Sequence, residues 1–209
     1  MFGLIKKDLL MIKQNLKVFL IVFIVFLSMT IINESDMTFI LPLMATMLSI
    51  STFSYDSFNK WDAYAITLPN GRRNIVTAKY ISTLLIVLIS FGVSITSLLI
   101  MSKCGVALNL SSSIAELIGC LAAVFIIISV MFPIIYKLGV EKGRIALFVL
   151  FFGVTGLAVL ISQNMHISIS SNIIGFLNNY YKIIIPIVAC ILMFVSYKFS
   201  ERFYFKKEF

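Results

Sequence analysis

The segment Tyr55–Tyr80 contains the residues best suited to recognising another protein. If Phe58–Leu68 forms a helix, Trp61, Tyr64 and Leu68 share one face at positions i, i+3 and i+7. The charged residues around that face are Asp56, Lys60 and Asp62. An aromatic anchor ringed by charge is typical of a binding hot spot. A helix at a membrane surface has the same composition, because Trp and Tyr also gather among lipid headgroups, so both interpretations stay open.

Residues for enzymatic chemistry are scarce. The single histidine, His166, belongs to no H-E-x-x-H pattern, and no G-x-S-x-G motif occurs. Cys104, Cys120 and Cys190 show no C-x-x-C spacing, so we expect packing residues rather than metal ligands. The sequence also contains no G-x-x-x-x-G-K-[ST] motif, which predicts that the chain binds no nucleotide, cofactor or metal by itself. These features argue against an enzyme.

The overall composition indicates which elements position these residues. Of the 209 residues, 60% are apolar and only 12% are charged, whereas soluble domains contain about 25% charged residues. This excludes an ordinary soluble domain, and neither a disordered chain nor a disulfide scaffold fits so apolar a sequence with three cysteines. We therefore predict an all-α protein that crosses a membrane several times.

Six uncharged apolar stretches divide the sequence, and each approaches the roughly 20 residues that a helix needs to cross a bilayer. Flanking lysines can extend them by laying their methylenes along lipid. The predicted spans cover about 16–33, 37–54, 78–101, 115–136, 145–162 and 181–198, within a single domain of residues 1–209. No ionisable residue lies in their apolar cores, which disfavours an ion-coupled carrier.

Residues 2–14 are predicted to form an amphipathic helix in the membrane interface, before the chain turns into the first span. The apolar face would contain Phe2, Ile5, Leu9 and Ile12. The polar face would contain Lys6, Lys7, Lys13 and Gln14. The alternative is a simple positively charged lead-in that fixes topology, and we prefer the interfacial helix.

The positive charges fall on one side of the predicted membrane. Of the 17 Lys and Arg residues, only Lys103 and Lys182 lie outside the N-terminal segment, the links after the second and fourth spans, and the C-terminal tail. The positive-inside rule therefore places both termini in the cytoplasm and the acidic hairpin Asn33–Asp36 outside. Most of the net charge of +8 is thus a topology signal, and no nucleic-acid partner is expected.

Two of the cytoplasmic links resemble known permeases. The first contains Asp56, Lys60-Trp61-Asp62, Leu68-Pro69, Arg72, Ile75-Val76 and Lys79-Tyr80. The second contains Pro133, Tyr136-Lys137 and Gly139–Arg144. Together with the six predicted spans, these strings resemble the short permease subunits of the ABC-2 family across essentially the whole chain. Permeases of this kind include those that export antimicrobial or amphipathic peptides, phenol-soluble modulins among them, or that confer resistance to such peptides.

The resemblance implies a type V exporter-like transmembrane domain, with a cytoplasmic coupling helix in the link 55–77 between the second and third spans. The chain would lie in a bacterial cytoplasmic membrane and pair with a second permease chain, identical or different. Two copies of a separate cytosolic ATPase would bind ATP and Mg. Part of Ser162–Asn179 would be free to fold back into the outer leaflet.

The resemblance also assigns roles to individual residues. Those that would contact the ATPase are Asp56, Lys60, Trp61, Asp62, Tyr64, Leu68 and Pro69. Those that would brace this element at the membrane are Arg72, Lys79 and Tyr80. Those that would form a smaller second contact are Glu141, Lys142, Gly143 and Arg144.

Two stripes of hydroxyl residues follow helical faces of the second and third spans. Their members are Thr38, Thr46, Ser49, Thr83, Ser90, Ser94 and Ser97. They would line a translocation path, or they would simply pack helix against helix, and we prefer packing because membrane helix interfaces are enriched in small and hydroxyl residues.

We therefore expect the permease subunit of an ATP-driven exporter that moves an amphipathic or hydrophobic substrate out of the cell. The alternative is a non-transporting membrane sensor or assembly protein, whose Trp61 segment binds a cytosolic partner.

Overall fold

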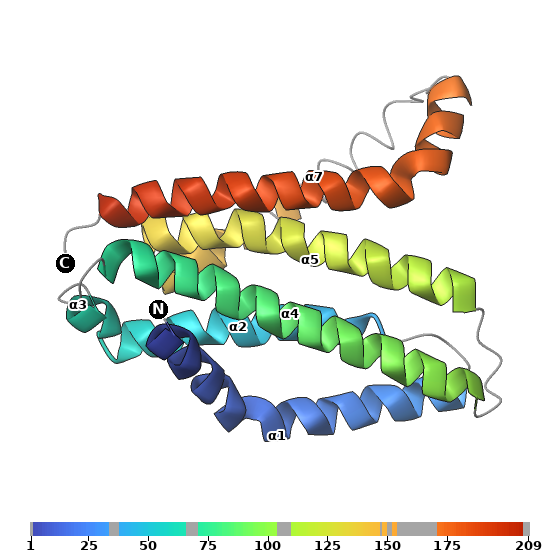
Figure 1. Cartoon of the computed structure of the whole chain (residues 1–209), viewed down its shortest axis with the longest axis horizontal. Coiled ribbons are helices and arrows are strands. Elements are labelled where there is room, and N and C mark those ends of the chain that lie inside the picture. Colours follow the sequence, from blue (N-terminus) through green and yellow to red (C-terminus); the bar gives the residue numbers. More distant parts are fainter. Residues whose placement is uncertain are drawn as a thin grey trace.

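The computed structural model describes residues 2–33, 38–65, 71–103, 110–146, 148–149, 152–153 and 171–206. Within these ranges the chain forms a helical bundle, as the sequence predicts (Figure 1). Its helices are α1 (Phe2–Asn33), α2 (Ile40–Phe58), α3 (Trp61–Ala65), α4 (Gly71–Lys103), α5 (Leu110–Leu138) and α7 (Ser171–Phe205). Residues 140–146 are also helical. The start of α1, the end of α7 and α3 lie at one end of the bundle, here called the α3 end (Figure 1).

Four of the described helices are long and apolar enough to cross a membrane: Phe2–Ile32, Arg73–Lys103, Ser112–Leu138 and Ile184–Phe205. They correspond closely to the predicted first, third, fourth and sixth spans. The second predicted span corresponds to α2, which has 19 residues. Most of the fifth, and residues 162–170 of the segment expected to fold back, lie outside the described residues. The count of six spans therefore stays a prediction.

The first helix differs from its prediction. Residues 2–14 and the first span belong to one continuous helix, which bends but does not break (Figure 1). The face buried against the bundle contains Asp8 and Ile12, whereas Phe2 and Leu9 are exposed together with Lys6. Asp8 and Ile12 therefore determine which side of this helix faces inward, and the location of residues 2–14 in the membrane interface stays a prediction.

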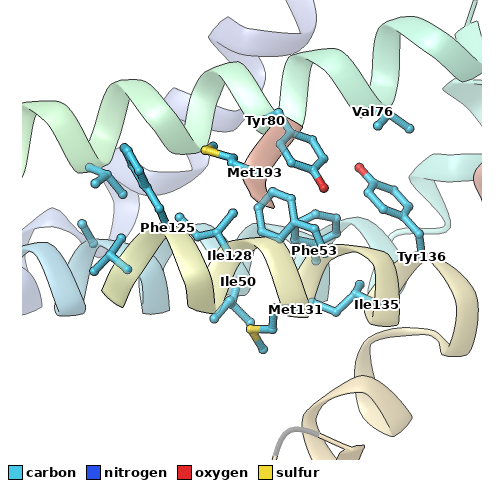
Figure 2. Close-up of a cluster of buried hydrophobic side chains, with 14 of the residues drawn as sticks. Ile50, Phe53, Val76, Tyr80, Phe125, Ile128, Met131, Ile135, Tyr136 and Met193 are labelled. Carbon is cyan, nitrogen blue, oxygen red and sulfur yellow. The ribbon is translucent and has the colours of Figure 1, made fainter. Parts of the chain in front are cut away.

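An aromatic cluster joins the helices near the α3 end (Figure 2). The ring of Phe53 on α2 lies edge-to-face 4.9 Å from Phe132 and 5.4 Å from Tyr136, both on α5. Tyr80 on α4 lies 4.8 Å from Phe132 and 5.5 Å from Tyr197 of α7. Edge-to-face contacts of this kind each contribute about 0.5–1.5 kcal/mol beyond the area they bury. Four helices are thus fixed to one another directly beside α3.

Polar contacts between α4 and α7 reinforce the same end. The Tyr80 hydroxyl lies 2.7 Å from Ser196 Oγ and 2.8 Å from Ser200 Oγ. One turn earlier on α4, Thr77 Oγ1 lies 3.0 Å from the Tyr197 hydroxyl. These pairs satisfy polar groups that would be costly to bury alone, and they set the register between the two antiparallel helices.

Candidate functional site

Four charged side chains from three helices meet at the α3 end, and we call them the charge cluster. Lys7 and Asp8 come from α1, Asp56 from α2 and Lys79 from α4. Asp8, Asp56 and Lys79 are only 2%, 5% and 3% exposed. The two ammonium groups balance the two carboxylates, so the cluster is neutral as a whole. Apart from the neighbours Lys7 and Asp8, its members are far apart in sequence, and only the packing of α1, α2 and α4 brings them together.

Lys79 is the centre of the charge cluster. Its ammonium group donates to Asp8 Oδ1 at 3.0 Å and to Thr52 Oγ1 at 2.9 Å, and lies 2.7 Å from Asp56 Oδ2. These three acceptors match the three donors of an ammonium group. Ser82 Oγ adds a bond of 3.1 Å to Asp8 Oδ2. Such close pairing offsets the large cost of removing the charges from water.

Lys7 connects the charge cluster to α3. Its ammonium group lies 2.5 Å from Asp56 Oδ1 and 4.5 Å from the centre of the Trp61 ring. A cation over an indole face is attracted by the ring quadrupole. The Trp61 ring in turn lies 5.3 Å from that of Tyr64, which is 59% exposed. A five-residue helix is too short to be stable alone, so these contacts give α3 a defined position.

The predicted helix Phe58–Leu68 begins later than expected. Phe58 is the last residue of α2, and α3 begins at Trp61. Between them Lys60 has a φ of 50°, a left-handed conformation that ends a helix. The predicted start is therefore wrong by three residues, but the Trp61–Tyr64 pair on one face is present. Leu68 and Pro69 lie outside the described residues, as do the side chains of Asp62 and Arg72.

The residues expected to contact an ATPase divide into two groups. Asp56, Lys79 and Tyr80 are buried, so their side chains hold the segment in place rather than forming its surface. Lys60 and Tyr64 are exposed, and Phe58, which the prediction did not include among the contact residues, is 87% exposed. The described surface of this segment therefore combines the exposed rings of Phe58 and Tyr64 with the charged Lys60.

The second predicted contact segment follows α5. Gly139 ends that helix with a φ of +85°, and its N–H donates to the Ile135 carbonyl at 2.8 Å. A new helical stretch starts at residue 140, and a Cβ added at Gly143 would lie 3.1 Å from Ile135 Cγ1. Glycine at position 139 thus suits the left-handed backbone conformation, and at position 143 it avoids a tight contact with the Ile135 side chain. Glu141 and Lys142 remain exposed on this turn.

The structure brings the two predicted contact segments together. Arg144 Nη2 donates to Ser54 Oγ of α2 at 2.7 Å. Between α2 and the turn after α5 lies a groove of about 780 Å³. The residues lining it include Ser54, Tyr55, Phe58, Leu138, Glu141 and Lys142. The α3 end therefore presents one continuous surface from two separate links.

We expect Gly139→Ala to destabilise the protein, since a left-handed conformation costs a residue with a Cβ about 1–2 kcal/mol. The same substitution at Gly119, a helical residue of α5 with open space around it, should be neutral or stabilising by up to about 1 kcal/mol. Melting temperatures of the two variants in detergent compare the effects directly. Equal melting temperatures would contradict the assigned backbone conformation.

The hydroxyl stripes lie inside the bundle. All seven predicted residues are buried. Ser94 Oγ on α4 donates to the Thr38 carbonyl before α2 at 3.1 Å, and Ser49 Oγ donates within α2 to the Ala45 carbonyl. These contacts fit the packing interpretation, because a path between two protomers would be lined by side chains on the outside of each.

Sequence reasoning missed Lys7 and Asp8 as members of the site, together with their partners Thr52 and Ser82. One signal pointed to them, since Asp8 is the only acidic residue before Glu34 and stands in a lysine-rich segment.

The described residues contain no group of three or more His, Cys, Asp or Glu side chains that could hold a metal ion.

A family model described as ABC-2 family transporter protein matches residues 3–204 of this chain, nearly its full length. No curated protein matches the sequence, and no solved structure matches it either.

Proposed function

Because the chain belongs to the ABC-2 family of transporter proteins, we propose that it is the permease subunit of an ATP-driven exporter. It is a multi-pass membrane protein, and permeases of this family generally work with a cytosolic ATPase. The α3 end would face the cytoplasm, in keeping with the distribution of lysine and arginine. ATP and Mg would be bound by two copies of that ATPase, and a second permease chain would complete the transporter.

The observation that carries this proposal is the attachment of α3 to the charge cluster. Trp61 contacts Lys7, and Lys7 pairs with Asp56, which in turn pairs with Lys79. A push on α3 would therefore act on α1, α2 and α4 together. Closure of an ATPase on this surface would then move packed helices as rigid bodies between two arrangements.

The proposed substrate is amphipathic or hydrophobic, such as a peptide toxin or an antimicrobial peptide. An open groove of about 470 Å³ between α1 and α4 supports this class. Its lining is almost entirely apolar and includes Phe23, Leu27 and Ile31 of α1 with Val93 and Met101 of α4. The two hydroxyls in the lining, of Thr96 and Ser97, donate within α4 to the carbonyls of Val93 and Ser94, so they add little polarity.

Co-purification tests the proposed function. The tagged chain would be expressed with an ATPase that carries a Walker A motif and is encoded beside its gene, and the pair extracted in detergent. We expect a stable complex whose ATP turnover differs from that of the ATPase alone. A permease that purifies by itself and leaves ATP turnover unchanged would contradict the proposal and favour a non-transporting sensor or assembly protein.

A further inference from the structure

The N-terminal half of α1 carries a stripe of lysines on its outward face. Lys6, Lys13 and Lys17 follow one another at i, i+7 and i+11, which places them within about 40° of each other around a helix. All three are exposed. Apolar side chains flank the stripe on both sides, and those exposed are Phe2, Leu9, Leu10 and Leu16. We call this surface the lysine stripe.

The lysine stripe has no acidic residue to balance it. Asp8 is the only carboxylate in this part of the sequence, and it points inward to Lys79. Lys7, the fourth lysine here, is drawn inward by Asp56. Among the residues that the structure describes, no ion pair involves Lys6, Lys13 or Lys17. The outward surface is therefore positive, and it suits an anionic partner.

The same face of α1 continues as an apolar surface along the span. Leu20, Ile24 and Ile31 lie on the helical face that carries the lysines, and all three are exposed. This face is apolar along the span and cationic where the apolar run ends. The order matches that of a bilayer, in which the hydrocarbon layer is followed by the layer of lipid phosphates. Lysine side chains between apolar neighbours can reach those phosphates while their methylenes stay in contact with lipid.

We propose that the lysine stripe binds the phosphate groups of anionic lipids in the cytoplasmic leaflet, and that this binding is transmitted to α3. The inference rests on the orientation given under the proposed function. Transmission uses the opposite face of the same helical turns, where Asp8 contacts Lys79. Lys7 lies between them and reaches both Asp56 and the Trp61 ring, at 2.5 Å and 4.5 Å. A shift of this part of α1 changes the position of Lys7 over Trp61.

The chain supplies its own reporter, because Trp61 is its only tryptophan. The purified protein would be placed in lipid nanodiscs of phosphatidylcholine with increasing fractions of phosphatidylglycerol, with no ATPase present. Two quantities would be measured: the phosphatidylglycerol retained by the protein in native mass spectrometry, and the emission of Trp61. We expect both to change with the anionic fraction, and the change to weaken at high salt.

Variants distinguish lipid binding by the lysine stripe from a general effect of positive charge. The triple variant Lys6→Gln, Lys13→Gln and Lys17→Gln should lose about tenfold or more in apparent affinity for phosphatidylglycerol. Replacing the same lysines with Arg should retain it. The matched control replaces three other exposed lysines, Lys137, Lys198 and Lys206, with Gln and should behave like the unmodified protein. Lys7→Gln combined with Asp56→Asn, which keeps the charge cluster neutral, should keep lipid retention but lose the response of Trp61.

Four outcomes would overturn the proposal. The first is that neither the emission of Trp61 nor the retention of lipid changes with the fraction of phosphatidylglycerol. The second is an equal loss in the control triple variant. The third is the same response to inorganic phosphate in neutral nanodiscs, which would identify a site for free anions. The fourth is efficient cross-linking of two chains through a cysteine at position 13, which would make this face an interface between copies. A Trp61 response that survives in the double variant Lys7→Gln with Asp56→Asn would overturn transmission through Lys7.

Because the experiment contains no ATPase, its outcome is independent of the co-purification test. Loss of the lipid response would leave the proposed permease function intact. Failure to bind an ATPase would contradict the proposed permease function but would not change the result of the lipid measurement.

Discussion

Replacing Lys79 with methionine is expected to remove most of the folded protein from the membrane. The substitution keeps an unbranched chain of similar length but deletes the ammonium group that serves Asp8, Asp56 and Thr52. Two buried carboxylates would then share the single cation of Lys7. Breaking a buried ion pair by removing one partner typically costs about 3–5 kcal/mol, which is a large part of the stability of an ordinary protein. The melting temperature in detergent and the amount of protein in membranes measure this loss.

Lys103→Met provides the matched control, because Lys103 is exposed at the opposite end of the same helix. It should leave both measurements unchanged. Adding Asp8→Asn to Lys79→Met restores charge balance between Lys7 and Asp56, so the double variant should recover part of the lost stability. If Lys79→Met proves as stable as Lys103→Met, the burial of the charge cluster is wrong.

The second large effect is expected from Phe58→Ala combined with Tyr64→Ala. These rings are 87% and 59% exposed on the surface that would meet the ATPase, and neither belongs to the charge cluster. Exposed aromatic anchors of an interface often cost 2 kcal/mol or more when truncated, or roughly thirtyfold in affinity. The variant should therefore lose the ATPase during purification while its melting temperature stays close to that of the unmodified permease.

Phe194→Ala is the control for this second prediction. Phe194 is also exposed, at 66%, but it lies within the apolar span of α7, where a cytosolic protein cannot reach. It should retain the ATPase. A double variant that binds the ATPase as tightly as Phe194→Ala would show that the aromatic surface beside α3 is not the contact, and would direct attention to the turn at Glu141 and Lys142.

The helices could be predicted from the sequence because long apolar runs in a membrane leave the backbone few alternatives. The boundaries were less predictable. The first helix runs continuously from Phe2 to Asn33, since no proline or glycine interrupts it after Gly3. Conversely, the break between α2 and α3 depends on a left-handed Lys60, and a lysine gives no local signal for that conformation.

The candidate site was predicted in part. The spacing of Trp61 and Tyr64 is a property of the helix itself, and the two rings do contact each other. The charge cluster was not predicted, because its pairs connect residues that are 49 and 71 positions apart. Periodicity along one segment contains no information about such partners. For the same reason Asp56 was assigned to a surface, although Lys79 and Lys7 hold it inside.

The order of the charge cluster along the chain has a consequence for biogenesis. A membrane protein is inserted as it is synthesised, so Lys7, Asp8 and Asp56 are present before Lys79 has been translated. During that interval two carboxylates face one ammonium group, and α1 and α2 cannot bury them without a net negative charge. Closure of the bundle must therefore wait for α4. A nascent chain that ends before residue 79 should remain open and accessible to proteases and insertion factors, and the arrival of one lysine should allow three helices to assemble together.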